Sequence, residues 1–385
     1  NHEVILTHSI SNNSGTEMAS SSLINEFGQA TLVDAPLLLA SEDNDSAKKQ
    51  AIQQKIRIEL ERQNQQFNKP EYHGQITDQQ AKQLISKRYS NETFSPSKLE
   101  RYAECPFLFY IEKVLNLNLD SEAEKEIQPK DKGTIIHNVL ESFYSEHSTN
   151  NSEQELKQTI AKITRAVFEQ HKKLLVDTAA QLHPFELRDI EAAVFQIIKL
   201  ENAQLNTLEK PLSPFVNEWS FGNSAENALK IKTDNSADIL LQGKVDRIDT
   251  SSSKDEFIIT DYKTGTTVDS VRKKLATGKH LQLPLYIEAV RQLLLPNSNP
   301  LGGILVDVAK AEKKHGLLKK DFNEKCFSMS SRSHSLVETD EWDNAINQAI
   351  ESTKQYVQSI RAGNFQTQLE RCKYCANGDI CRVRK

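Results

Sequence analysis

The chain has 385 residues, of which 48 are Lys or Arg and 53 are Asp or Glu, so its formal net charge is −5. This length accommodates a sizeable core and two or three domains, and the ordinary charged content is that of a globular protein. The mildly acidic balance gives no overall signature of nucleic-acid binding, so such a role would need a local basic groove. No apolar stretch is long enough to span a bilayer, and the five cysteines do not form a small secreted disulfide scaffold.

The first 92 residues are expected to form an arm and a linker. Residues 3–7 predict a short strand, and the Gln-rich segment 46–68 predicts a charged surface helix with a thin apolar stripe. No G-x-x-x-x-G-K-[ST] phosphate loop occurs in the sequence, so it contains no ATPase motor. The chain begins at Asn1 without a charged-then-apolar leader, and we expect it to be a fragment of a longer protein.

Residues 94–117 predict two short helices packed as a buried hairpin. Ser95 is suited to cap the first helix, a proline follows it at the first helical position, and Ser97 and Glu100 have the spacing of a capping box. A second proline directly after Cys105 ends this helix, and a strongly apolar run follows.

An amphipathic helix is predicted over residues 132–147. His137 and Glu141 lie four residues apart on it and therefore share one face. A lone histidine on a helix is usually a surface or core residue, so this pattern alone assigns His137 no role.

Residues 151–210 are expected to be mostly helical, with long segments at 153–177 and 184–209. Their sequence by itself supports only helix packing. A strand is predicted next, at 214–222, and it carries Glu218. By itself this residue could be an ordinary strand glutamate that makes a salt bridge.

The sequence then predicts a β-hairpin with strands at 239–249 and 256–262 and a polar turn between them. Because strand side chains alternate between faces, Asp261 and Lys263 point the same way. Asp246 lies on the partner strand, close enough in a hairpin to share a site.

Two carboxylates and one ammonium at the end of a sheet suit metal-assisted phosphodiester hydrolysis. Carboxylate oxygens are the ligands that Mg²⁺ prefers, and the metal keeps waters and open positions for a phosphate. It lowers the pKa of a bound water and offsets the charge that builds up in the transition state. A solvated hairpin with an ordinary D-x-K turn is the alternative that these residues leave open.

Two further segments follow the hairpin. A helix is predicted over 280–295, on which Gln282 and Tyr286 lie four residues apart and share a face. Residues 268–276 before it carry a basic cluster that can touch phosphates or simply end a solvated helix. That cluster consists of Arg272, Lys273 and Lys274.

The last core elements are predicted from their apolar patterns alone. A strand is expected at 300–310 and a strand pair within 317–333. A long amphipathic helix is expected at 339–362, and its acidic start and basic end suit the helix dipole.

The C-terminal sequence ERCKYCANGDICRVRK contains a metal-site pattern. Cys372 and Cys375 are separated by two residues, and Cys375 and Cys381 by five. A closed tetrahedral set or a cubane cluster needs a fourth ligand, for which Cys105 is the candidate and Cys326 the alternative. Spacing alone slightly favours zinc. Residues 371–385 carry five basic residues against one acidic residue, so this tail can also contact DNA phosphates.

Six motifs in this order resemble those of the PD-(D/E)XK nucleases, specifically the RecB/AddB-type exonuclease branch. They are S-x-S-x-L-x-x-Y-x-x-C-P from Ser95, G-x-x-x-H-x-x-L-E from Gly133, G-x-x-D-R-I-D from Gly243, I-T-D-Y-K-T-G from Ile259, Q-x-x-x-Y from Gln282, and the cysteine cluster.

The resemblance implies an α/β fold in which a mixed central sheet is flanked by helices and carries a large helical insertion. The nuclease domain would cover 93–385, with the insertion at 151–210 and the cysteine-rich tail at 371–385. Residues 1–92 would then be an arm and linker whose start resembles the tail of a superfamily-1 helicase-like domain, a disordered arm being the alternative.

The resemblance also implies roles for individual residues. Asp246 and Asp261 would bind Mg²⁺ or Mn²⁺, and His137 would supply a further metal ligand. Lys263 would position the attacking water. The remaining site residues, which would support the site or the DNA strand, are Gln282, Tyr286 and, on the first core strand, Glu218.

For the cysteines, the resemblance implies a structural [4Fe–4S] cluster rather than zinc, held by Cys105, Cys372, Cys375 and Cys381. The implied function is Mg²⁺-dependent exonucleolytic cleavage of single-stranded DNA or unwound ends in the bacterial cytoplasm. A helicase partner, or a helicase domain of the longer protein, would act with it in double-strand break repair.

Two rival functions belong to other classes. In one, the fold and the cluster hold DNA or scaffold a helicase while cleavage is negligible, but the intact Asp246, Asp261 and Lys263 argue against it. In the other, the chain is a zinc-stabilised nuclease that processes RNA, which metal analysis and a comparison of RNA with DNA would distinguish.

Overall fold

The computed structural model describes residues 74–117, 129–146, 152–171, 183–205, 207–233, 237–264, 271–327, 329–330 and 333–367, together with the isolated residues 53, 54, 56, 375 and 381. The chain divides into two compact units, Asp78–Phe365 and the terminal segments Asn1–Thr77 with Gln366–Lys385. The predicted strand at 3–7 and most of the predicted helix at 46–68 lie outside the described residues. None of the helices described here is long and apolar enough to cross a membrane.

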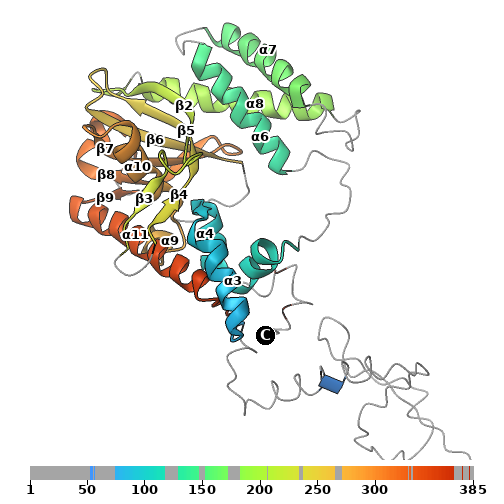
Figure 1. The fold of residues 1–385 in the computed structure, drawn as a ribbon. Coiled ribbons are helices and arrows are strands. Elements are labelled where there is room, and N and C mark those ends of the chain that lie inside the picture. The colour runs from blue at the N-terminus through green and yellow to red at the C-terminus, as the bar shows by residue number, and fades with distance from the viewer. Residues whose placement is uncertain are drawn as a thin grey trace, which may run out of the picture. The chain divides into compact units, whose positions relative to one another are not determined.

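A six-stranded mixed sheet is the centre of the Asp78–Phe365 unit (Figure 1). Its strand order is β2-β5-β6-β7-β8-β9. The β6–β7 and β8–β9 pairs are parallel and the other pairs are antiparallel. The strands are β2 (Ser213–Phe221), β5 (Gly243–Thr250), β6 (Glu256–Lys263), β7 (Asn299–Asp307), β8 (Glu312–Lys319) and β9 (Leu336–Val337).

The strand predicted as continuous over 239–249 is broken at Gln242, and this part of the prediction is wrong. Residues before the break form β4 (Ile239–Leu241), which belongs to a separate three-stranded sheet with β1 (Thr93–Phe94) and β3 (Leu229–Ile231). The amide of Gln242 donates to the carbonyl of Phe94 at 2.9 Å. The chain therefore passes from one sheet to the other at this residue, and β5 begins at the glycine that follows.

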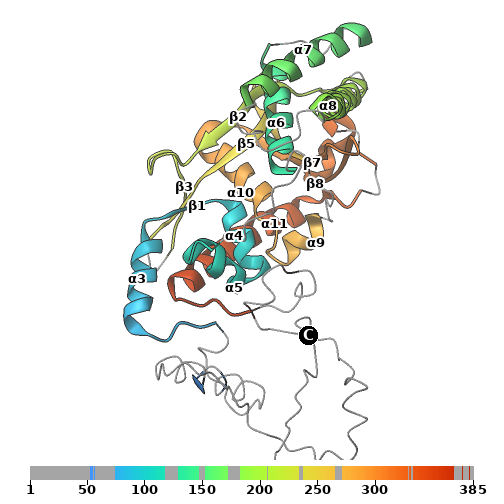
Figure 2. The same cartoon turned by 90° about the vertical axis from the view of Figure 1, so that its right-hand side faces the viewer.

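Three helices form a layer beside the central sheet, in which the first packs against β2 and β5 and the second packs on the other two (Figure 2). They are α6 (Pro129–Glu146), α7 (Glu153–His171) and α8 (His183–Leu205). Their apolar stripes share one buried core with sheet residues such as Ile258, Tyr262 and Ile304. The predicted helix at 132–147 is confirmed, and so is helix within 151–210 over the described residues 153–171 and 183–205.

The opposite face of the sheet carries α10 (Gln282–Ala289), which continues as a π-helical turn over Val290–Leu294, and α11 (Thr339–Arg361). Gly303 allows α10 to approach closely, because a Cβ there would lie 2.9 Å from Leu283 of α10 and 3.0 Å from Ile259 of β6. The remaining helices are α3 (Gln79–Ser90), α4 (Pro96–Glu104), α5 (Pro106–Phe109), which continues as a π-helical turn over Tyr110–Val114, and α9 (Val271–Ala276).

Two segments fold differently from the prediction. Residues 79–90, expected to be a connector, form α3, which Asp78 caps by accepting from the amide of Ala81 at 2.7 Å. Among the described residues of 317–333 the predicted strand pair does not form, because β8 ends at Lys319 and the chain then makes 3₁₀- and π-helical turns over 320–327. The Asn323 side chain fixes those turns by bonding the amide and carbonyl of Met329 at 2.9 and 2.8 Å.

Candidate active site

Strand β6 presents Asp261 and Lys263 on the face that α10 covers. The Nζ of Lys263 lies 2.7 Å from Oδ2 of Asp261, although the pair is separated by one residue. Such a contact requires both side chains to leave the same face of the strand, as the alternation predicts. Asp261 is buried and Lys263 is half-buried, so little water screens this ion pair.

Gln282, the first residue of α10, joins both members of that pair. Its Nε2 donates to Oδ1 of Asp261 at 2.5 Å, and its Oε1 accepts from Nζ of Lys263 at 2.7 Å. The three side chains form a closed ring of polar contacts, which we call the lysine triad. It fixes the lysine ammonium at one position at the end of β6.

A second group, which we call the ligand triad, consists of His137 of α6, Glu218 of β2 and Asp246 of β5. One ligand atom from each residue lies within 4.8 Å of the other two. Nδ1 of His137 is 3.3 Å from Oδ1 of Asp246 and 3.6 Å from Oε1 of Glu218. An imidazole nitrogen and two carboxylate oxygens are a donor set that suits a divalent cation.

The hydrogen bond made by the other ring nitrogen of His137 fixes the orientation of the imidazole. Nε2 lies 3.0 Å from the main-chain carbonyl of Tyr262, and because a carbonyl only accepts, Nε2 carries the hydrogen. Nδ1 is thereby directed at the two carboxylates, in the orientation that metal-binding histidines commonly adopt.

The backbone at Glu218 is strained in a way that serves the ligand triad. Its φ angle is +52°, a left-handed conformation that glutamate rarely adopts. In the antiparallel β2–β5 pair, Asn217 faces Arg247 and Trp219 faces Val245, which leaves Glu218 and Asp246 opposite each other. Like charges in such positions repel unless a cation lies between them, and strain of this kind is concentrated at functional sites.

The two neighbouring carboxylates of the ligand triad shift the pKa values of its members. Burial opposes the charged form of His137, but hydrogen bonds with Asp246 and Glu218 outweigh it and raise its pKa to about 10. Burial also acts against the charge on Glu218, yet contacts with His137 and with the ammonium of Lys244 lower its pKa. A metal cation binding at Nδ1 of His137 would have to displace a proton.

The two triads are adjacent, and Tyr262 and Asp246 connect them. The amide of Tyr262 donates to Oδ2 of Asp246 at 2.7 Å, immediately after Asp261 in the chain. Burial, opposed by Lys263 and reinforced by the charge of Asp246, raises the pKa of Asp261 to about 6. Asp246 is thus close enough to act on Asp261 while it contacts His137.

The structure brings most of the predicted site residues together but groups them differently. His137 and Asp246 lie together as expected, and Glu218 completes their group. Asp261, for which a metal-ligand role is expected, contacts Lys263 and Gln282.

Tyr286 also lies at the site. Its buried ring packs edge-on against Phe221 with ring centroids 5.9 Å apart. Burial raises the pKa of its hydroxyl, which the backbone of Lys244 and the side chain of Gln282 contact.

The basic cluster and the cysteines are only partly within the described residues. The side chains of Arg272 and Lys273 lie outside them, whereas Lys274 is half-buried. Cys372 is also outside, and Cys375 and Cys381 belong to the terminal unit while Cys105 belongs to the other.

Cys326 lies in the hydrophobic core beside Phe327, and burial raises its pKa to about 11. That environment opposes the thiolate that metal binding requires.

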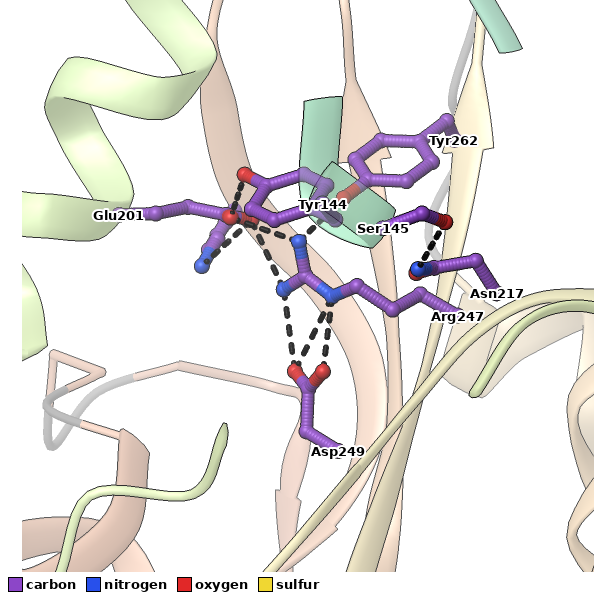
Figure 3. A network of polar contacts seen from close by, with 8 residues as sticks. Tyr144, Ser145, Glu201, Asn217, Arg247, Asp249 and Tyr262 are labelled. Atoms are coloured by element: carbon purple, nitrogen blue, oxygen red, sulfur yellow. Dashed lines mark hydrogen bonds and ion pairs between the residues drawn. The ribbon is translucent and has the colours of Figure 1, made fainter. Parts of the chain in front are cut away.

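A buried ionic network between β5 and the helices α6 and α8 was not predicted from the sequence (Figure 3). The guanidinium of Arg247 contacts Glu201 of α8 at 2.7 and 3.1 Å and Oδ1 of Asp249 at 2.9 Å. It also donates to the hydroxyl of Tyr262 at 2.5 Å and lies 4.4 Å from the ring centroid of Tyr144. The network joins α6 and α8 to Tyr262 of β6. The backbone of Tyr262 bonds both His137 and Asp246.

Two more residues contact the site and were not predicted from the sequence. Lys244 pairs with Glu218, and Glu100 bonds the amide of Gln282. Lys244 lies two residues before Asp246 on β5, and that spacing could have indicated it. Glu100 had been expected to form a capping box with Ser97, and this expectation is wrong. Ser95 does cap α4 by accepting from the amide of Lys98 at 3.2 Å, whereas the Glu100 carboxylate accepts from the start of α10.

Comparison with known proteins identifies similar chains. One subunit of an ATP-dependent helicase/deoxyribonuclease from Clostridium perfringens (strain SM101 / Type A) is 27% identical over 248 residues, which are 61% of this chain and 20% of that protein. The protein of the same name from Clostridioides difficile (strain 630) is 27% identical over 231 residues, 57% of this chain and 19% of its own length.

A third relative of that name, from Listeria monocytogenes serotype 4a (strain HCC23), is 29% identical over 210 residues, 51% of this chain and 17% of its own length. The match therefore spans about a fifth of the length of the curated relatives. The family model of the PD-(D/E)XK nuclease superfamily matches residues 93–382, a range that holds both triads on their mixed sheet. This chain is accordingly a member of the PD-(D/E)XK nuclease superfamily.

Proposed function

We propose that this chain is a metal-dependent deoxyribonuclease, working as an exonuclease on single strands or unwound ends. The observation that carries the proposal is the adjacency of the ligand triad and the lysine triad at one end of the central sheet. One group offers the nitrogen and oxygen donors that hold a divalent cation. The other holds an ammonium beside it, where the negative charge of a phosphate has to be balanced.

The residues of the ligand triad fit Mg²⁺ or Mn²⁺. His137, Glu218 and Asp246 would hold the ion, and Asp261 would join them if its contact with Lys263 is exchanged for the metal. The strained φ of Glu218 and the facing carboxylates are what a bound cation would stabilise. When bound, such a cation polarises a phosphoryl oxygen and makes a coordinated water more acidic.

Lys263 has the central role among the chain's own groups. Its ammonium is held between Asp261 and Gln282, and burial acts against its charge while the Asp261 carboxylate outweighs this and raises its pKa. It therefore stays protonated, orients the attacking water and neutralises the phosphate. Gln282 keeps it in position, and Tyr286 packs beneath the start of β5.

The proposal extends to a [4Fe–4S] cluster held by Cys105, Cys372, Cys375 and Cys381. It is supported by the cysteine spacing and by the place of Cys105, half-buried between α4 and α5. Iron, sulfide and zinc contents after anaerobic purification test it. The cluster is supported if the protein contains iron and sulfide that Cys372→Ser loses and Cys326→Ala retains. Stoichiometric zinc in place of iron would refute it.

The helicase partnership is proposed from the relatives. Their name describes a subunit of an ATP-dependent helicase/deoxyribonuclease, and this chain matches about a fifth of their length. We propose that the chain likewise degrades strands that a helicase motor unwinds during double-strand break repair. Arg272 and Lys273, with the basic C-terminal tail, would contact phosphates along that path.

Degradation of end-labelled DNA tests the nuclease. Single- and double-stranded substrates, and an RNA of the same sequence, are incubated with Mg²⁺ or Mn²⁺ and either wild type or Lys263→Ala. Lys320→Ala is the matched control, because that exposed lysine pairs only with Glu338 among the contacts of the described residues. We expect wild type and the control to cut DNA, and Lys263→Ala to bind DNA without cutting it.

The other outcomes separate the alternatives. Equal cleavage by wild type and Lys263→Ala would mean that the site is elsewhere. DNA binding without cleavage by wild type would support the scaffold role instead. Preference for RNA, combined with zinc in the metal analysis, would support the RNA-processing nuclease.

A further inference from the structure

Helix α10 begins without a cap of its own. Its N-cap residue, Leu281, has an apolar side chain that forms no capping hydrogen bond. The first amides of a helix have no partner within the helix, so a buried start requires an acceptor from elsewhere. That acceptor is Glu100 of α4, whose Oε1 accepts from the amides of Leu281 and Gln282 at 2.7 and 2.9 Å.

This contact fixes the residue that holds the lysine triad together. Gln282 is the first residue of α10, and its side chain bonds both Asp261 and Lys263. A shift of the backbone at Gln282 therefore moves its amide group relative to both partners. Glu100 is therefore connected to Lys263 through Gln282 alone.

The surroundings of Glu100 favour a rigid contact. Its side chain is largely buried, and the carboxylate lies at the positive end of the helix dipole. His280, directly before the helix, places Nδ1 3.5 Å from the same Oε1. Burial acts against the charge on Glu100, whereas the two amides, Lys263 and Lys274 act to stabilise it.

We propose that Glu100 is a positioning residue that sets the geometry of Gln282 and hence of Lys263. The proposal rests on the proposed nuclease function. Glu100 occupies an unspecified position of the S-x-S-x-L-x-x-Y-x-x-C-P motif, so the family resemblance assigns it no role. Because Cys105 ends the same helix, with its amide bonded to the Arg101 carbonyl at 3.2 Å, α4 also joins the cysteine to the active site.

Two substitutions at Glu100 and two matched controls test the proposal. Glu100→Ala removes the acceptor, whereas Glu100→Gln keeps an acceptor oxygen and removes only the charge. Glu104→Ala and Glu104→Gln make the same changes on the same helix, where Glu104 pairs with Arg101 at 2.7 Å. Single-turnover cleavage, DNA affinity and amide hydrogen exchange are measured for each variant.

For Glu100→Ala we expect the single-turnover rate constant to fall about 10–100-fold with DNA affinity unchanged, as for loss of an outer-shell partner. Glu100→Gln should recover most of that loss, because the amide oxygen can still accept from α10. Hydrogen exchange at the amides of Leu281 and Gln282 should be faster in Glu100→Ala, because these amides lose their acceptor. The Glu104 variants should match wild type in all three measurements.

Two results would overturn the proposal. One is unchanged exchange at Leu281 and Gln282 in Glu100→Ala. The other is faster exchange throughout α10 and α11 with a matching fall in Tm, which would mark a purely structural role. If wild type itself does not cut DNA, the proposed function fails, and the exchange measurement still decides whether Glu100 holds the start of α10.

Discussion

Nε2 of His137 donates a hydrogen bond to the main-chain carbonyl of Tyr262 over 3.0 Å. The amide of the same tyrosine donates to Oδ2 of Asp246 at 2.7 Å. One strand residue thus orients two members of the ligand triad through backbone atoms, which no side-chain substitution at this position removes. Its own side chain points the other way, into the ionic network around Arg247 (Figure 3).

Removal of the imidazole should weaken metal binding. For His137→Ala we expect the Kd for Mn²⁺, measured by isothermal titration calorimetry, to rise by at least about tenfold, since changes in or near a ligand shell cost about 10–100-fold. His334→Gln is the control and should bind like wild type, because the exposed His334 lies beside Glu341 and Asn344 of α11. Equal Mn²⁺ affinity in both variants would mean that Nδ1 of His137 is not a ligand.

Removal of the Tyr262 hydroxyl should affect stability but not the metal. In Tyr262→Phe the buried guanidinium of Arg247 loses one acceptor, so the free energy of unfolding should fall by about 1–3 kcal/mol. Mn²⁺ affinity should stay within about twofold of wild type, because the backbone contacts remain. Urea unfolding and calorimetry measure the two quantities, and a parallel loss of both would contradict this separation.

Stability should decrease in mild acid because of His280. Its imidazole is buried and faces Lys263, Lys274 and Glu100, and burial together with the two lysines lowers its pKa to about 3. Below its ordinary pKa of about 6.5 the unfolded chain binds a proton that the folded chain does not. The stability present above that pH is therefore lost as pH falls toward 3, by at most about 1.4 kcal/mol per pH unit.

The comparison of wild type with His280→Gln isolates that contribution. Urea unfolding at about pH 7.5, about pH 6 and about pH 5 gives the slope of stability against pH for each protein. The carboxyl groups that also titrate are the same in both proteins. The wild-type slope should be the steeper one, and identical slopes would show that His280 is not held neutral.

A side chain at Gly243 should disturb the start of β5. A Cβ there would lie 2.5 Å from Cε1 of Tyr286 and 2.8 Å from the ring of Phe221, and these two rings already support each other edge-on. Gly243→Ala should therefore lower the free energy of unfolding by about 1–3 kcal/mol, as overpacking does. Its DNA cleavage should also fall, because Lys244 and Asp246 follow on the same strand.

Gly133→Ala is the control for that substitution. A Cβ at Gly133 would meet only the hydroxyl oxygen of Thr264 within 3 Å, and that side chain can rotate away. Thermal unfolding should show a clearly smaller effect than for Gly243→Ala. A loss as large as that of Gly243→Ala would contradict the explanation through the Tyr286 and Phe221 rings.

Several local features of this protein follow from its sequence alone. Alternation along a strand put Asp261 and Lys263 on one face of the sheet, and helical spacing put Gln282 and Tyr286 on one face of a helix. These features follow from backbone geometry, which repeats every two residues in a strand and every 3.6 in a helix. The order of the motifs then indicated the superfamily that the family model shows.

The partner that each charged group meets was set by tertiary packing. Glu218 joins His137 and Asp246 in the ligand triad, because the β2–β5 register and a left-handed backbone place Glu218 opposite Asp246. Glu100 caps a helix 181 residues further along the chain instead of its own. Such contacts depend on how sheets and helices pack after folding, and no short-range pattern in the sequence encodes them.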